Sequence, residues 1–493
     1  MKEQSKFSKV LSILLSVVLV ISSFYLLYQV IRLNVLPSKF LFPLTIGVVV
    51  LDAIFILLLV YFSKNVVSKI VCIVLTLFIC VATCMGGYYI SKTQNVLSSI
   101  TNVAKHAKNT VSVVVKESSS IKNKSQLNGV SVGSLRLNEQ GSKKALKELS
   151  SEGIVLNQTE YDSMTTLLEA FYNGEVDSII INESSRSQIL DMEAYSNFDS
   201  NTRVVYQTSY KVKNNDAASA VTDITSKPFN VLISGSDTRG GFDENGRSDV
   251  IMIATVNPKT HTILLTSVPR DFYVTTACDA GDGCMQGALD KITHTGIHGT
   301  NTTKRTVEQL LGIEINYTFK VGFDTVTKLV DTLGGVDVYV EPGYAVHNEC
   351  INVKEGVNHL YGKEALEYAR ERYAYTEGDR QRTKNQQQVL MGIVKEATKP
   401  SVITNYAAIM DTMANTFSTT MSNEEITDLI KYQLNNNPTW KMEQYMVDGT
   451  GDTLMCAELG DAASVMVPDQ STVKMAKDKI NAVLAGKSSE DVK

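Results

Sequence analysis

The stretch that decides the fold is residues 229–274, FNVLISGSDTRGGFDENGRSDVIMIATVNPKTHTILLTSVPRDFYV. It holds three apolar runs bounded by Gly, Pro, Asn or Asp, a pattern that is typical of buried strands. We predict strands at Phe229–Ser234, Val250–Val256 and Thr262–Ser267, with a hairpin turn at Asn257–Thr260. Charged clusters interrupt these apolar strands, which is a usual way to present functional groups on a rigid scaffold.

Helical periodicity follows this stretch. We predict a strand at Val336–Val340 and helices at Thr303–Leu311, Phe323–Leu333, Gly362–Ala369 and Asn385–Ala397, the last two on either side of a charged loop. Strands therefore alternate with helices, which predicts an α/β fold with a central mixed β-sheet covered by helices. We assign this fold to residues 226–493.

A smaller α/β unit is predicted before it, at residues 93–225. Its expected strands are Val111–Val115, Ile154–Asn157 and Ser178–Ile181, and its expected helices are Lys143–Leu149 and Ser163–Tyr172. The stretch YNGEVDSIIIN at 172–182 is similar to a helix–turn–strand end of type 2 periplasmic solute-binding folds. It carries no catalytic motif, so we interpret the unit as an accessory domain that ends in a polar linker at 211–227.

Three long apolar runs occupy the first ninety residues, at Val10–Ile31, Phe40–Phe62 and Ile70–Ile90. Each can cross a hydrocarbon core of roughly 30 Å as a helix. The first run lacks a small-x-small cleavage site, so we predict an uncleaved anchor of three transmembrane helices at residues 1–92. The Lys/Arg bias of the short loops favours a cytoplasmic N-terminus. We therefore expect a multi-pass protein of the cell membrane whose C-terminal domain is extracellular.

Bulk charge and cysteine usage limit the function classes. A formal net charge of −5 offers no basic footprint for nucleic acid, so no nucleic-acid partner is expected. Four cysteines lie in the exported part, and two arrangements stay open: two disulfides, Cys278–Cys284 and Cys350–Cys456, or four free thiols. His294 and His298 have zinc-like spacing, but Gly296 and Gly299 argue against the helix that such a site needs.

Two kinds of charged cluster point to phosphate chemistry. Asp237 and Asp249 flank the Gly-rich segment GSDTRGGFDENGRSDV, and two such carboxylates suit Mg²⁺, although both could be solvated turn residues. Arg270 follows the third strand, and YARERYAYTEGDRQRTKNQQQ at 368–388 is rich in arginine. If the backbone around Arg370 is extended, Arg370 and Arg372 point the same way. Converging arginines bind phosphate oxygens, whereas a solvated, salt-bridged surface is the alternative.

The order of these segments resembles the LytR-CpsA-Psr (LCP) family. The segments are SGSDTR, GRSDVIMIATVNP, TSVPRDFYV, KITHTGIHG, LGGVDVYV, ALEYARERY and GDRQRTKNQQ, spread over about 228–400. The anchor and accessory unit are similar to the streptococcal capsule-associated CpsA type of architecture. The resemblance implies a metal-dependent phosphotransferase that uses Mg²⁺ or Mn²⁺. It also implies transfer of a polyprenyl-diphosphate-linked glycopolymer, here capsular polysaccharide, to peptidoglycan, with capsule export proteins as candidate partners.

The resemblance also implies roles for individual residues. Asp237 and Asp249 match metal ligands. The matches to catalytic positions are Arg270, Arg370, Arg372, Arg382, Asp379 and Gln386. The matches to substrate-binding positions are Arg247, Lys291 and Arg380. Many family members have arginine where this chain has Asn385, and Lys384 or Arg380 could replace the missing charge.

No nucleophile motif is present, since GxSxG, HExxH and GxxxxGK[ST] are all missing from the sequence. This favours direct attack by the acceptor hydroxyl, with Asp249 or Asp379 as candidate proton acceptors. Two other functions stay open. One is a non-catalytic binder or regulator of lipid-linked polysaccharide in a capsule export complex. The other is a membrane-bound transcriptional regulator, which the sequence favours least because no helix-turn-helix or basic face is visible.

Overall fold

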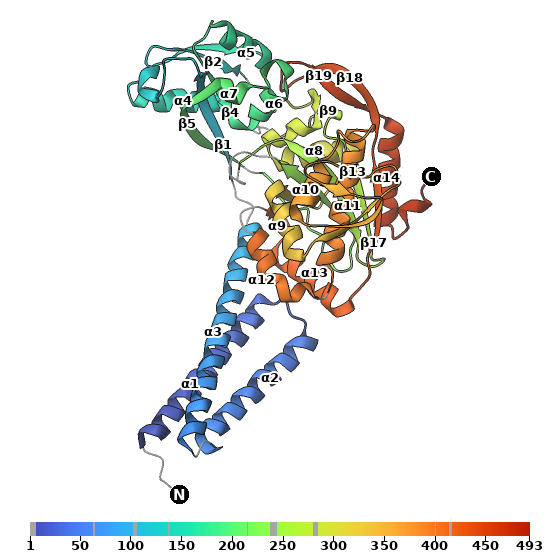
Figure 1. Cartoon of the computed structure of the whole chain (residues 1–493). Helices are drawn as coiled ribbons and strands as arrows, with labels where there is room; N and C mark the ends of the chain where they lie inside the picture. Colours follow the sequence, from blue (N-terminus) through green and yellow to red (C-terminus); the bar gives the residue numbers. More distant parts are fainter. Residues whose placement is uncertain are drawn as a thin grey trace. The chain divides into compact units, whose positions relative to one another are not determined.

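The computed structural model describes residues 6–62, 65–101, 106–136, 139–213, 215–236, 244–279, 284–399, 401–413 and 417–493. Contacts divide the chain into two compact units, and Figure 1 labels many of their helices and strands. Unit 1 contains residues 1–101, 395–414 and 422–439. Unit 2 contains residues 102–394, 415–421 and 440–493.

Unit 1 is built on three long apolar helices, α1 (Lys6–Leu33), α2 (Ser38–Leu57, continued by a π-helical turn, Leu58–Phe62) and α3 (Val66–Thr101). All three are long and apolar enough to cross a membrane, as the sequence predicted. Polar groups meet between them: the Ser23 hydroxyl donates to Asp52 Oδ1 at 2.9 Å, and Thr83 Oγ1 donates to Ser22 Oγ at 3.0 Å. Such pairing satisfies groups that hydrocarbon cannot.

Two helices from far along the chain complete unit 1, α12 (Val402–Met413) and α13 (Asn423–Asn436). Both contact α3. Lys92 Nζ lies 2.8 Å from Asp411 Oδ2, and Thr101 Oγ1 donates to Asn423 Oδ1 at 2.6 Å. The capping box of Ser422 with Glu425 fixes the start of α13.

The accessory part of unit 2 has a five-stranded sheet in the order β3-β2-β4-β1-β5. Its strands are β1 (His106–Lys116), β2 (Ser131–Leu135), β3 (Asn157–Tyr161), β4 (Ser178–Asn182) and β5 (Thr202–Lys213). Its helices are α4 (Glu139–Ser151), α5 (Met164–Asn173), α6 (Arg186–Asp191) and α7 (Phe198–Asn201). The strand predicted at Ile154–Asn157 is wrong by three residues. Ile154 packs into the core ahead of β3, which is a polar, exposed strand.

The second sheet of unit 2 has six strands in the order β16-β11-β6-β7-β8-β17. The three predicted strands are present as an antiparallel meander, β6 (Phe229–Ser236), β7 (Ser248–Asn257) and β8 (Thr262–Val268). β11 (Tyr317–Gly322) and β17 (Lys441–Met446) add in parallel, and β16 (Phe417–Thr419) adds antiparallel, so the sheet is mixed as expected. The predicted strand Val336–Val340 exists as β12, but it pairs with β15 (Gly356–Leu360) outside this sheet.

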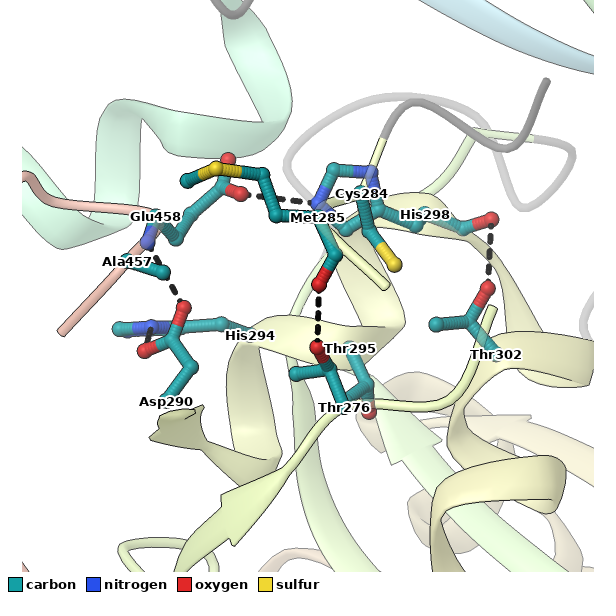
Figure 2. A pocket seen from close by; sticks show the side chains of 10 residues that line it. All are labelled: Thr276, Cys284, Met285, Asp290, His294, Thr295, His298, Thr302, Ala457 and Glu458. Carbon is teal, nitrogen blue, oxygen red and sulfur yellow. Dashed lines mark hydrogen bonds and ion pairs between the residues drawn. The ribbon is translucent and has the colours of Figure 1, made fainter. Parts of the chain in front are cut away.

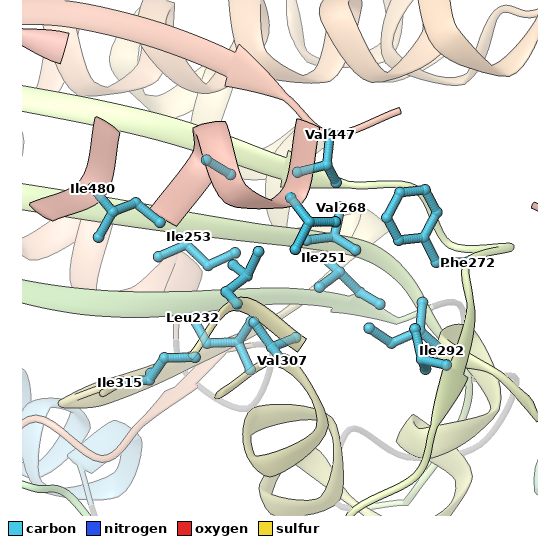
Figure 3. Packing of buried hydrophobic residues seen from close by; sticks show 14 of the residues in the cluster. Leu232, Ile251, Ile253, Val268, Phe272, Ile292, Val307, Ile315, Val447 and Ile480 are labelled. Atoms are coloured by element: carbon cyan, nitrogen blue, oxygen red, sulfur yellow. The ribbon is translucent and has the colours of Figure 1, made fainter. Parts of the chain in front are cut away.

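Helices cover the sheet. α8 (Thr300–Leu311) and α14 (Gln470–Leu484) pack with β6, β7 and β8 in one apolar cluster, in which Val307 and Ile480 meet the strand residues (Figure 3). α9 (Phe323–Leu333), α10 (Gly362–Arg370) and α11 (Asp379–Ala397) contribute to a second cluster with β12 and β15. The observed architecture is therefore the predicted α/β fold with a mixed sheet.

A clasp closes the C-terminal end of unit 2. The carboxylate of Glu443 on β17 accepts hydrogen bonds from the Ser488 hydroxyl and the Ser489 N–H, both at 2.8 Å. Lys441 Nζ lies 2.8 Å from the same carboxylate. The Glu443 side chain is 2% exposed, so its carboxylate is stabilised by these protein groups rather than by water.

Candidate active site

The antiparallel pairing of β7 and β8 brings Asp249 and Arg270 together. Asp249 is the second residue of β7 and Arg270 follows β8 by two residues, while Ile251 and Val268 are paired between them. Arg270 Nη1 donates to Asp249 Oδ1 at 2.8 Å, and both side chains are largely buried. Thr293 Oγ1 donates to the same carboxylate oxygen at 3.4 Å.

Carboxylates stabilise the charge of Arg270. Burial alone would lower the pKa of its guanidinium, but the carboxylates of Asp249 and Asp271 outweigh burial and raise that pKa above its ordinary value. Asp271 in turn lies 3.3 Å from Lys291 Nζ. Lys291, a predicted substrate-binding residue, is thus joined to Arg270 through Asp271, which the sequence analysis did not single out.

Arg382 extends this cluster from α11. It pairs with Asp379, three residues earlier on the same helix. Burial lowers the pKa of the Arg382 guanidinium, Asp379 opposes this effect, and the positive charges of Arg270 and Arg372 lower the pKa further. A guanidinium whose charge is disfavoured by neighbouring arginines gains most from an anionic ligand, so this region of the protein is suited to bind phosphate.

Unused hydrogen-bond donors indicate the same kind of ligand. The Nε atoms of Arg247, Arg270 and Arg382 are buried and have no hydrogen-bond partner among the described residues. Buried donors in native proteins are nearly always paired. Arg247 Nε lies 3.9 Å from Asp249 Oδ1, which is too far for a hydrogen bond. Three buried guanidinium N–H groups are thus available to an oxyanion.

Other candidate residues make different contacts. Arg380 pairs with Asp448 at 2.7 Å, and the Arg370 guanidinium lies over the Phe323 ring at 5.4 Å. Arg370 is the last residue of helix α10, so the extended backbone assumed for it and Arg372 does not apply to Arg370. Gln386 is half-buried on α11, four residues after Arg382 and so on the same helix face.

Asn385 has a structural role. It is fully buried, and its side-chain amide donates to Tyr368 O at 3.0 Å and to the Tyr375 hydroxyl at 3.2 Å. Lys384 lies 3.4 Å from Glu377, and the guanidinium of Arg380 is occupied by Asp448. No contact among the described residues joins Lys384 or Arg380 to the Arg270 cluster, so the structure does not support either one as a replacement for the missing arginine.

Of the two candidate metal ligands, only Asp249 lies among the described residues, and Asp237 lies outside them. Asp249 Oδ1 accepts from Arg270 and Thr293, whereas Oδ2 accepts no hydrogen bond from the described residues. A carboxylate with one free oxygen fits Mg²⁺, which often takes one or two carboxylates together with substrate phosphates. The part of the chain that the structure describes holds no group of three or more His, Cys, Asp or Glu suited to a metal.

A polar pocket lies beside the site, around the 3₁₀ turn Ile292–His298 (Figure 2). His294 Nδ1 is 2.7 Å from Asp290 Oδ1, and His298 Nε2 is 2.9 Å from Glu458 Oε2, so each histidine faces its own carboxylate. The Glu458 N–H also donates to Asp290 Oδ2 at 2.8 Å. These contacts tie the segment that carries Lys291 and Thr293 to the loop that carries Glu458.

The four cysteines after the apolar helices form one disulfide and two free thiols. Cys278 and Cys284 are bonded, as one of the two sequence-based arrangements required. The Cys350–Cys456 pair of that arrangement is wrong, because Cys350 is exposed and free while Cys456 is buried and free. Burial, and then the Asp290 carboxylate, raise the pKa of Cys456 to about 12, so its thiol stays neutral.

The chain is similar in sequence to a known protein family and to several of its characterised members. Residues 195–482 match the model of the LytR_cpsA_psr family. The polyisoprenyl-teichoic acid–peptidoglycan teichoic acid transferase TagU of Bacillus subtilis (strain 168) is 35% identical over 203 residues, which are 41% of this chain and 63% of that protein. The TagU of Bacillus licheniformis is 33% identical over 226 residues, 46% of this chain and 70% of that protein. The crystal structure of B. subtilis TagU, 29% identical, covers 52% of this chain and 97% of that one with a TM-score of 0.41.

Proposed function

The chain belongs to the LytR_cpsA_psr family, and from this membership we propose that it transfers a glycopolymer from a polyprenyl diphosphate carrier to peptidoglycan. The observation that carries the proposal is the set of buried arginines Arg247, Arg270 and Arg382, whose Nε donors have no hydrogen-bond partner among the described residues. Arginine clusters bind the oxygens of a diphosphate and neutralise charge that develops during phosphoryl transfer. The names of the TagU relatives support the same class of reaction.

The proposed reaction is a direct displacement at phosphorus. The acceptor hydroxyl oxygen of peptidoglycan forms a bond to the phosphorus that carries the polymer. The bond from this phosphorus to the bridging oxygen of the diphosphate breaks, and polyprenyl phosphate leaves with the electron pair. Arg270 and Arg382 bind the non-bridging oxygens and stabilise the leaving phosphate.

The hydroxyl proton passes to a carboxylate in this mechanism. Each candidate carboxylate pairs with one arginine, Asp379 with Arg382 and Asp249 with Arg270. We assign the proton to Asp379, because its side chain is 28% exposed and thus more accessible to an acceptor than that of Asp249, which is 12% exposed. Asp249, together with Asp237, would hold Mg²⁺ or Mn²⁺, which would supply further positive charge at the diphosphate.

We propose capsular polysaccharide as the polymer, because the order of three apolar helices, accessory domain and C-terminal domain resembles the CpsA type of architecture. The same reasoning makes capsule export proteins candidate partners. A membrane anchor would tether the chain to the bilayer that contains the polyprenyl carrier. The Lys/Arg bias of the loops supports an extracellular site, where peptidoglycan is available.

Binding and transfer by the purified full-length chain test the proposal. Arg270→Ala and Arg382→Ala should each weaken polyprenyl diphosphate binding by about 10- to 100-fold in the presence of Mg²⁺, since a hydrogen bond to a charged group contributes about 1.5–3 kcal/mol. Arg136→Ala is the matched control, because Arg136 is an exposed arginine of the accessory domain paired with Asp162. Unchanged binding in both active-site variants would refute the proposal. Tight binding without any transfer would favour the non-catalytic binder.

A further inference from the structure

The accessory domain is attached to the catalytic domain next to the active site. Glu244 lies five residues before Asp249 and is 8% exposed. Its carboxylate accepts from the Thr110 hydroxyl at 2.6 Å and lies 3.1 Å from Lys108 Nζ, and the backbones of residues 108 and 244 form a β-bridge. Strand β1 of the accessory domain therefore fixes the segment that leads into β7.

A second contact keeps the accessory domain in place. The tip of the hairpin formed by β18 (Gly449–Cys456) and β19 (Asp461–Pro468) meets the start of α5. The Met164 N–H donates to Leu459 O at 2.9 Å, and Thr165 Oγ1 donates to Asp461 at 2.5 Å. Gly460 has a φ of +62°, and a Cβ there would come within 2.7 Å of Ser163 Cβ, so the two surfaces fit closely.

One side chain of the accessory domain reaches the active-site network. Asp191, at the end of α6, forms an ion pair with Arg247 Nη1. The Arg247 side chain is 12% exposed, whereas Asp191 is 55% exposed. The opposite edge of this guanidinium places the unpaired Nε towards Asp249, which binds Arg270. Asp191, Arg247, Asp249 and Arg270 thus form a continuous series of charges from the accessory domain into the site.

We infer that Asp191 is a positioning residue for the reaction, through which the accessory domain orients Arg247 so that its Nε edge faces the substrate diphosphate. This inference deepens the proposed function and rests on it. The carboxylate holds one edge of a planar guanidinium, and the rigid fork then fixes the direction of the other donors. The accessory domain is in this view a structural part of the active site.

A double-mutant cycle tests the inference with the full-length chain in detergent and geranylgeranyl diphosphate as the probe. Asp191→Ala should weaken binding by about threefold to tenfold, as expected for neighbouring residues that act through one another. Arg247→Ala should weaken it further, and the double variant should equal Arg247→Ala. Glu193→Ala is the matched control, because it removes an exposed carboxylate two residues away. Its binding should match the wild type.

The outcomes separate this inference from the proposed function. A wild-type chain that fails to bind the probe refutes both. Binding by the wild type with unchanged or tighter binding by Asp191→Ala refutes only the positioning role, and tighter binding would mean that Asp191 competes with phosphate. The positioning role is also refuted if the two substitutions are additive, that is, if the double variant binds the probe more weakly than Arg247→Ala by the same factor that Asp191→Ala alone costs. Thermal unfolding of Asp191→Ala, read from the fluorescence of Trp440, should match the wild type, which excludes a folding defect.

Discussion

Replacing Glu443 with Gln probes the C-terminal clasp through its charge. Burial alone would raise the pKa of this carboxyl, but Lys441 and the donors from Ser489 and Ser488 lower it from 4.5 to about 2. A carboxyl with these folded and unfolded pKa values stabilises the fold by about 3 kcal/mol at neutral pH. Because the folded pKa is the lower one, this contribution is complete above pH 4.5 and is lost as the pH falls towards 2.

The difference in unfolding free energy between the wild type and Glu443→Gln should therefore shrink with acid. From the same two pKa values we expect it to fall by about 2 kcal/mol between pH 7 and pH 3. Urea unfolding of the full-length chain, followed by fluorescence, measures it well. The single tryptophan, Trp440, lies three residues from Glu443 and contacts His261 with ring centroids 5.8 Å apart.

Glu490 provides the matched control for this measurement. Its carboxylate also pairs with Lys441, at 2.7 Å, but its side chain is 70% exposed. Exposed ion pairs contribute about 0–1 kcal/mol, so Glu490→Gln should change stability little at either pH. A wild-type advantage over Glu443→Gln that is the same at pH 7 and pH 3 would refute the reasoning, since it would mean that the Glu443 charge does not stabilise the fold.

Three further outcomes are expected. Asn385→Arg, which restores the arginine of many family members, should destabilise the chain by about 2 kcal/mol or more, because it buries a charge and removes the donor to Tyr368 O; a variant with wild-type Tm and faster transfer would contradict this. Cys278→Ser, which opens the disulfide, should cost about 2 kcal/mol for such a short loop, measured by urea unfolding. In the native wild type, alkylation followed by mass spectrometry should modify the exposed Cys350 and spare the buried Cys456. An equal rate at both thiols would contradict the burial of Cys456.

Local patterns in the sequence predicted the strands β6, β7 and β8 and the turn between β7 and β8, because each strand carries its own apolar run and turn residues. The same patterns did not show where β12 pairs, since its partner β15 is set by tertiary contacts. The start of α11 was also missed. Its first turns are DRQRTKN, which have almost no apolar residues, so periodicity could not indicate a helix there.

In the site, too, local sequence patterns could indicate some contacts, whereas contacts between distant segments could not be predicted. The pairing of Asp249 with Arg270 follows from two adjacent strands, so their convergence was accessible from sequence. Asp271 directly follows Arg270 in the PRDF segment and could have been found by that proximity. The contact of Asp191 with Arg247 joins residues 56 positions apart in different domains, and no local pattern encodes it. The same holds for Cys456, whose lack of a disulfide depends on where β18 packs.

The membership of α12 and α13 in unit 1 bears on how the protein can be studied. Leu97 and Ile100 of α3 are buried, as are Ile409 and Met410 of α12. A chain that begins after Thr101, the last residue of α3, would keep α12 and α13 but lose the helix that they pack on, and their apolar side chains would then be exposed to water. Truncated forms meant for crystallisation or enzymology should begin before Lys92, so that the extramembrane part of α3 remains and the two returning helices do not promote aggregation.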